Sequence, residues 1–231
     1  ETDDVGLFFR YFDGFFLYGF LLSFADEDLF EYFDPKVRDT SKRDFDWFEN
    51  VWSRTVVNQD LSYIGKLFSL STNLPAFQKR FPDAKILYMV RDPLNVIPSG
   101  LSLVTGVLDK RFGFWSLNKD KRDQYIERLY NALVTLLRRF HEDWTNGNIN
   151  QSSVFIVRYD KMMSNFDQLM DSILGFIGQQ PSDDLIRKIK ETAEAQRNYK
   201  SKHGYDLKKF GLSEEKIKTD CKFVYDTFLT K

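Results

Sequence analysis

Short apolar runs alternate with longer stretches that have apolar residues at helical spacing. The runs at residues 86–90 and 153–157 are almost wholly apolar, and continuous runs of this length are typical of strands buried in a parallel sheet. A third run at residues 66–70 predicts another short strand. The pattern therefore indicates a small sheet built from segments that lie far apart along the chain.

The segments around these runs predict helices. In residues 125–144 the apolar positions recur every three or four residues, which indicates a long helix with one buried side. The other predicted helices cover 44–63, 73–80, 166–178 and 181–198, one begins at Pro93, a short one begins at the acids 26–28, and a last one runs from Ser213 to the carboxyl end. Strands that alternate with helices predict a helix-rich α/β fold, with helices flanking a parallel sheet.

Composition narrows the class of protein. No repeat or linker divides the 231 residues, so we expect a single domain, with a helical, Phe-rich part at 1–65 and a core at 66–231. The net charge of −1 offers no global basic field for nucleic acid. The single Cys221 excludes an internal disulfide framework, and with only two histidines the chain argues against a structural zinc site. One cysteine fits a reducing compartment, so we expect a cytoplasmic location.

Residues 5–25 are almost continuously apolar and rich in Phe. Three interpretations stay open: a buried or partner-covered segment, an element on a membrane surface, and a membrane span. A span would place Arg10 and Asp13 inside the bilayer at a cost of several kcal/mol, which favours the first interpretation. Because the chain begins at Glu1 rather than Met, we expect a fragment or a processed chain.

The run at 86–90 stops abruptly at Arg91-Asp92-Pro93. Pro93 suits the first turn of a helix, because its fixed φ fits there and its missing N–H is not needed. Ser99 then lies about two turns into that helix. Ligands of open α/β sheets bind outside the carboxyl ends of the strands, where Arg91 would supply a planar fork of donors and Ser99 one more. The alternative is an arginine that is simply ion-paired at the end of a strand.

The segment from Phe81 to Ser99 resembles the 3′-phosphate-binding segment of sulfotransferases that use 3′-phosphoadenosine-5′-phosphosulfate (PAPS). In that family a strand ends in Arg-Asp/Asn-Pro, and a Ser follows eight residues after the Arg. The resemblance implies a P-loop NTPase-like sulfotransferase fold, with PAPS as co-substrate and no metal. It implies transfer of a sulfuryl group to a hydroxyl or amine acceptor, and it implies that Arg91 and Ser99 grip the 3′-phosphate of the donor.

Two further stretches resemble the same family. Residues 157–163 match a block in which a strand ends in Tyr-Glu-Asp/Asn, and the family's Tyr lies near the adenosine, which implies that position for Tyr159. On physical grounds alone, Tyr159 is as well explained by packing. Residues 199–212 resemble a basic loop that closes over the phosphates, which implies that role for Lys200, Lys202 and His203, whose alternative is a solvated run of charge.

The general base departs from the family pattern. Residues 71–75 align with the Lys-Thr-His-Leu-Pro stretch of cytosolic members, whose His is the base, but Asn73 stands at the His position. An amide cannot accept a proton at neutral pH. Other branches of the family use a carboxylate, so the acids to test are Glu27, Asp28 and Asp26, whose alternative is an acidic cluster at a helix start.

The family's amino-terminal loop, which cradles the 5′-phosphosulfate, has no counterpart in this sequence. The resemblance covers about residues 66–231, with a weaker match at 20–65, and in the family the loop precedes this part. We therefore expect an incomplete chain, or a natural pseudoenzyme, that transfers sulfate poorly on its own. A cradle contributes several charge-assisted hydrogen bonds of roughly 1.5–3 kcal/mol each.

Two functions from other classes stay open. One is a P-loop kinase-like enzyme acting on another nucleotide, and the other is a non-catalytic interaction module that lies against a membrane through residues 5–25. If the chain is a sulfotransferase, its Phe-rich front suits a small-molecule or lipid-like acceptor.

Overall fold

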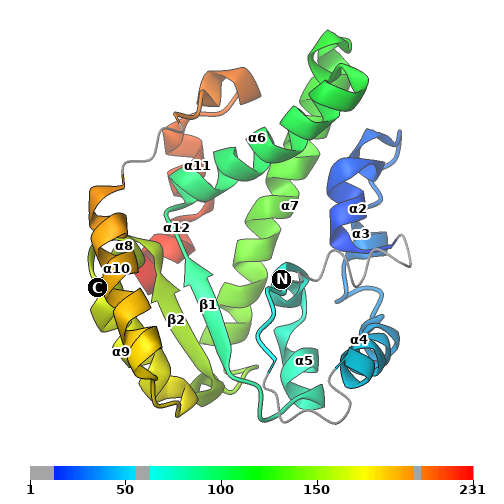
Figure 1. Ribbon diagram of the computed structural model, residues 1–231. Helices are drawn as coiled ribbons and strands as arrows, with labels where there is room; N and C mark the ends of the chain where they lie inside the picture. The colour runs from blue at the N-terminus through cyan, green and yellow to red at the C-terminus, as the bar shows by residue number, and fades with distance from the viewer. Residues whose placement is uncertain (1–12, 56–62, 200–203, 231) are drawn as a thin grey trace.

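Two parallel strands and a set of long helices form an α/β fold (Figure 1). The computed structural model describes residues 13–55, 63–199 and 204–230. Strand β1 (Ile86–Val90) pairs in parallel with β2 (Val154–Arg158), and Val90 lies opposite Arg158. Both strands therefore end at the same edge of the sheet, as sequence runs at these positions predict.

A pair of long helices connects the two strands. The connection consists of α6 (Pro93–Phe112), η4 (Phe114–Ser116) and α7 (Lys119–Thr145). The helix α6 starts directly after β1, with Asp92 as N-cap and Pro93 in its first turn. It ends at Gly113, whose φ of 66° is in the left-handed region that only glycine adopts without strain. The chain turns there, and α7 runs back beneath the sheet (Figure 1).

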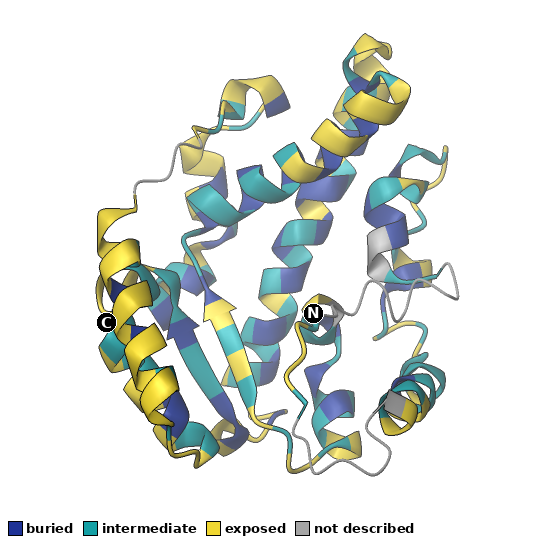
Figure 2. Cartoon of the chain, in the orientation of Figure 1, coloured by how far each residue is buried: buried dark blue, intermediate teal, exposed yellow. Residues whose placement is uncertain are grey.

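The core lies where the sheet meets α7. Tyr88 of β1 stacks on Phe140 of α7, with ring centroids 3.3 Å apart and planes 7° apart, and Phe140 is fully buried. The alternate residues of β1, Leu87 and Met89, are exposed on the other face (Figure 2). The apolar stripe of α7 therefore covers only one face of β1, whereas the other face is left partly open.

The helices that follow β2 cover its second face. They are α8 (Tyr159–Ser164), α9 (Phe166–Ile177) and α10 (Asp183–Asn198). Phe155 of β2 contacts Phe176 of α9, with ring centroids 5.5 Å apart. Most of the outward surface of α10 is exposed in Figure 2, whereas Ile189 and Ala193 are buried, which makes α10 a typical amphipathic surface helix.

The carboxyl-terminal segment returns to the core. It consists of η6 (Leu207–Phe210), α11 (Glu214–Asp220), α12 (Lys222–Val224) and the π-helical turn η7 (Tyr225–Leu229). Ser213 caps α11 by accepting a hydrogen bond from the Lys216 N–H at 3.1 Å, as predicted. The buried Phe228 packs against Phe140 and Trp144 of α7. The end of the described chain is thus fixed against the same helix that supports the sheet.

The amino-terminal elements pack on the other side of α7 from the strands (Figure 1). They are α2 (Phe15–Phe20), η2 (Leu22–Phe24), α3 (Phe30–Phe33), α4 (Ser41–Thr55), η3 (Phe68–Thr72) and α5 (Leu74–Arg80). Tyr18 and Phe33 form a second, smaller apolar cluster with Leu136 of α7. Within the described ranges, no helix combines the length and the apolar character needed to cross a bilayer. Residues 1–12, which include part of the Phe-rich segment, lie outside the described residues.

Two of the predicted elements need correction. The strand predicted over residues 66–70 is wrong, because apart from a single bridge at Lys66 this segment is the 3-10 helix η3. The Ser71 hydroxyl donates to the Phe68 carbonyl at 3.0 Å, a local bond of the kind that competes with strand pairing. The helix predicted over 44–63 begins earlier, at Ser41, where the Asp39 carboxylate accepts the Ser41 N–H, and its predicted end lies outside the described residues.

Candidate functional site

Arg91 and Tyr159 lie side by side at the carboxyl ends of the two strands. Each residue directly follows a strand, and the strands are in a register that places Val90 opposite Arg158. The guanidinium carbon of Arg91 lies 4.3 Å from the centroid of the Tyr159 ring, which is a cation–π contact. The parallel pairing therefore brings together two residues that are 68 positions apart in the sequence.

Arg91 forms no ion pair with any of the described residues, although it is only half-buried. Arg158 shows the contrast, because its Nε and Nη2 donate to the Asp160 carboxylate at 3.1 and 2.9 Å. The hydrogen bond from Arg158 holds the pKa of Asp160 below its usual value. The ion-paired alternative for Arg91 is thus not what the described structure shows, and its fork of donors is available to an anionic ligand.

A carboxylate caps the start of α6 beside Arg91. The Asp92 carboxylate accepts the Leu94 N–H at 2.9 Å and the Tyr225 hydroxyl at 2.6 Å. Burial raises the pKa of Tyr225, and the bond to Asp92 raises it further, so this hydroxyl stays a donor at neutral pH. The Asp92 carboxylate thus already caps the positive end of the α6 dipole, which leaves Arg91 as the cation available to an anionic ligand at this corner.

Ser99 lies in the second turn of α6, six residues beyond Pro93, which is about 9 Å along the helix axis. It is half-buried, and its hydroxyl has no hydrogen-bond partner among the described residues. A shared role with Arg91 in holding a phosphate stays a prediction. Both residues belong to the same strand–helix unit, Arg91 just after β1 and Ser99 within α6.

A comparison with known protein families shows which family the chain belongs to. The model of the sulfotransferase family matches residues 24–184. The chain belongs to the sulfotransferase family. The matched range contains both strands and the two long helices between them, and it includes Arg91, Ser99 and Tyr159. No curated protein and no solved structure matched. The family membership by itself supports a sulfotransferase function in general.

The acids proposed as a general base lie elsewhere in this sulfotransferase-family chain. Asp28 accepts the Tyr18 hydroxyl at 2.8 Å and the Phe30 N–H at 3.0 Å, and Asp26 pairs with Lys121 at 2.8 Å. Glu27 is exposed beside them. Figure 1 shows this segment, between η2 and α3, across α7 from the two strands. The structure does not bring these acids to Arg91.

The remaining predicted residues are not all within the described chain. Lys200, Lys202 and His203 lie outside the described residues, so their role as a lid over the phosphates stays a prediction. Asn73 stands at the N-cap of α5, and its amide donates to Asp39 at 3.4 Å. The Asn73 side chain makes no capping hydrogen bond to α5, and its described polar contact is the one with Asp39.

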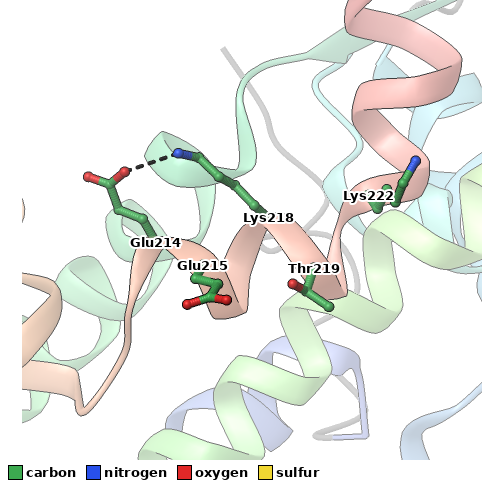
Figure 3. A pocket seen from close by; sticks show the side chains of 5 residues that line it. All are labelled: Glu214, Glu215, Lys218, Thr219 and Lys222. Atoms are coloured by element: carbon green, nitrogen blue, oxygen red, sulfur yellow. Dashed lines mark hydrogen bonds and ion pairs between the residues drawn. The ribbon is translucent and has the colours of Figure 1, made fainter.

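Two surface hollows are lined by residues other than those of this corner. One, of about 600 Å³, is lined by four charged side chains and Thr219 of α11 and the start of α12, and Lys218 pairs there with Glu214 at 3.2 Å (Figure 3). The other, of about 320 Å³, is apolar and lies at the far end of α6; its lining is Leu21, Phe24, Leu108, Phe112, Phe114 and Leu117. Leu108 is about 22 Å along α6 from Pro93, too far to hold a group that reacts beside Arg91. No cluster of His, Cys, Asp or Glu within the described ranges is placed to hold a metal ion.

Sequence reasoning missed Tyr225. Its bond to Asp92 joins positions 133 residues apart, and the local sequence around either residue carries no signal of the other. The Arg-Asp-Pro run identifies the corner, but only the fold shows that the carboxyl-terminal segment braces it.

Proposed function

We propose that the chain serves the transfer of a sulfuryl group from PAPS to a hydroxyl or amine acceptor, with weak turnover when the chain acts on its own. The observation that carries the proposal is the Arg91 guanidinium, which lies over the Tyr159 ring at the carboxyl edge of the sheet and has no carboxylate partner among the described residues. A cation that contacts an aromatic ring but no carboxylate of the described residues suits a nucleotide that carries an extra phosphate. The match to the sulfotransferase family supports the same function.

Each residue has a role in this proposal. Arg91 and Ser99 hold the 3′-phosphate by charge-assisted hydrogen bonds, and Tyr159 faces the adenosine. Lys200, Lys202 and His203 close over the phosphates. Catalysis would come from positioning the acceptor in line with the sulfuryl group and from stabilising the charge of the leaving phosphate, as in phosphoryl transfer.

Calorimetric titration with adenosine 3′,5′-bisphosphate tests the proposal through binding. Arg91→Ala removes the guanidinium, and a hydrogen bond to a charged group is worth about 1.5–3 kcal/mol, so we expect affinity to fall about 10- to 150-fold. Arg187→Ala is the matched control, because Arg187 lies on α10, where Asp184 and Glu191 already pair with it.

ATP is titrated in parallel, because a kinase-like enzyme would bind it more tightly than the bisphosphate. An unchanged affinity in Arg91→Ala, or tighter binding of ATP than of the bisphosphate, would refute the proposal. The readout is binding, so it does not depend on turnover or on the acceptor.

A further inference from the structure

The two residues that join β1 to α6 are neighbours of opposite charge, yet they do not pair. Elsewhere in the chain, an adjacent Arg and Asp close on each other: Arg43 Nε donates to Asp44 Oδ1 at 2.8 Å, and Arg43 Nη2 lies 2.7 Å from the same oxygen. Arg91 and Asp92 make no such contact. Some other group therefore determines where the Asp92 carboxylate points.

Tyr225 is that group. Its hydroxyl donates to Asp92 Oδ1 at 2.6 Å, and the same oxygen accepts the Leu94 N–H at 2.9 Å. Both donors lie on the side of α6 and the carboxyl-terminal segment, so together they draw the carboxylate toward the helix. The two bonds compete with the pull of the neighbouring guanidinium.

A rigid part of the core presents this hydroxyl. Val224 and Phe228, on either side of Tyr225, are buried, and the Phe228 ring lies 5.7 Å from the Phe140 ring. Thr227 Oγ1 lies 3.1 Å from the Nε2 atom of His141 on α7. The segment is a π-helical turn, a rare geometry that is frequent at functional sites.

We propose that Tyr225 is a positioning residue, which holds Asp92 against α6 and so keeps the Arg91 guanidinium free for an anionic group of the ligand. The identity of that ligand rests on the proposed function, whereas the arrangement of the three residues does not. Without the Tyr225 hydroxyl, Asp92 turns to Arg91 and competes with the ligand.

Binding of adenosine 3′,5′-bisphosphate to three variants gives the first test. Tyr225→Phe should weaken binding about two- to fivefold, the range that corresponds to an exposed ion pair. Adding Asp92→Asn to Tyr225→Phe should restore wild-type affinity, because Asn caps a helix as well as Asp but forms no ion pair. Tyr130→Phe is the control, since it breaks a similar bond, to Asp220 (2.7 Å), that involves neither Asp92 nor Arg91. Unchanged binding in Tyr225→Phe, or no recovery in the double variant, would overturn the proposal.

A measurement without ligand separates this proposal from the proposed function. The side-chain Nε–H signal of Arg91 is assigned by its loss in Arg91→Ala and followed by NMR. It should shift in Tyr225→Phe, toward the signal of the paired Arg43, and return in the double variant. A shift that reverses supports the positioning role even if the wild-type chain binds no bisphosphate, and a signal that does not move refutes it.

Discussion

The buried carboxylate of Asp143 gives the sharpest test of how the amino-terminal elements are attached to α7. Its side chain is 1% exposed, and the Nζ of Lys36 lies 3.4 Å from Oδ1, which also accepts the Asn148 amide at 3.2 Å. The second oxygen, Oδ2, has no hydrogen-bond partner among the residues that the structure describes. Lys36→Met would leave this charge without a cation, while keeping most of the volume of the side chain.

The structure sets the size of the effect. Removal of one partner of a buried ion pair typically costs 3–5 kcal/mol, but the Lys36 side chain is 33% exposed, so solvent screening reduces the expected loss to about 2–3 kcal/mol. Asp143→Asn removes the buried negative charge, and one end of the new amide takes the position of Oδ2. In that background, Lys36→Met should cost less than about 1 kcal/mol.

Urea unfolding of the four chains of this cycle, followed by circular dichroism, gives the free energies of unfolding from midpoint and slope. Lys42→Met is the control, because it breaks the exposed pair with Asp46 (91% and 41% exposed) and should leave the midpoint unchanged. If Lys36→Met costs as much in the Asp143→Asn background as in the wild-type chain, the loss comes from packing and the electrostatic reasoning is refuted.

Further outcomes follow from the glycines of α6 and from the buried thiol. Gly113→Ala at the C-cap of α6 should lower the free energy of unfolding by about 1–2 kcal/mol, because φ is +66° and a Cβ would lie 3.0 Å from the Ser116 hydroxyl. Gly106→Ala, inside α6, should raise the free energy of unfolding by about 0.5–1 kcal/mol, because a Cβ there meets open space. Equal melting temperatures of the two variants would contradict this reasoning. Burial raises the pKa of Cys221 from 9.0 to about 12, so the native thiol should not react with Ellman's reagent at pH 8. The unfolded thiol ionises at a lower pH than the buried native thiol. The contribution of the protonated thiol to the stability of the native state is therefore present below about pH 9 and is lost as the pH rises toward 12. Unfolding of wild type and Cys221→Ala at pH 8 and 10 would detect this loss.

The parts of the fold that carry local signals could be predicted from the sequence. The apolar run ends at the Arg-Asp-Pro corner, so β1 and the start of α6 are at their predicted positions. The second strand extends one residue further than predicted, because Arg158 continues the pairing with Val90 although its side chain is charged. The long helix predicted from residue 125 begins earlier, at Lys119. The pattern of apolar residues missed this start because the first turns are solvated and carry charges rather than an apolar stripe.

The rest depends on contacts between distant positions. The motifs predicted Arg91 and Tyr159 as parts of one site, but the cation–π contact between them depends on the register of the two strands. The bond between Asp92 and Tyr225 depends on the path of the carboxyl-terminal segment over α7. The strand predicted at 66–70 is wrong because three apolar residues in a segment of five fit a short helix as well as a strand.

The pairing of β1 with β2 also has a consequence during translation. Ile86 and its partner Val154 are separated by about 70 positions, and ribosomes add about 5–20 residues per second. The apolar run Ile-Leu-Tyr-Met-Val therefore leaves the exit tunnel roughly 3–14 s before the strand that pairs with it. An uncharged run of this kind is a template for aggregation while it waits. A chaperone that covers this run until β2 has been synthesised should consequently improve the yield of the folded chain.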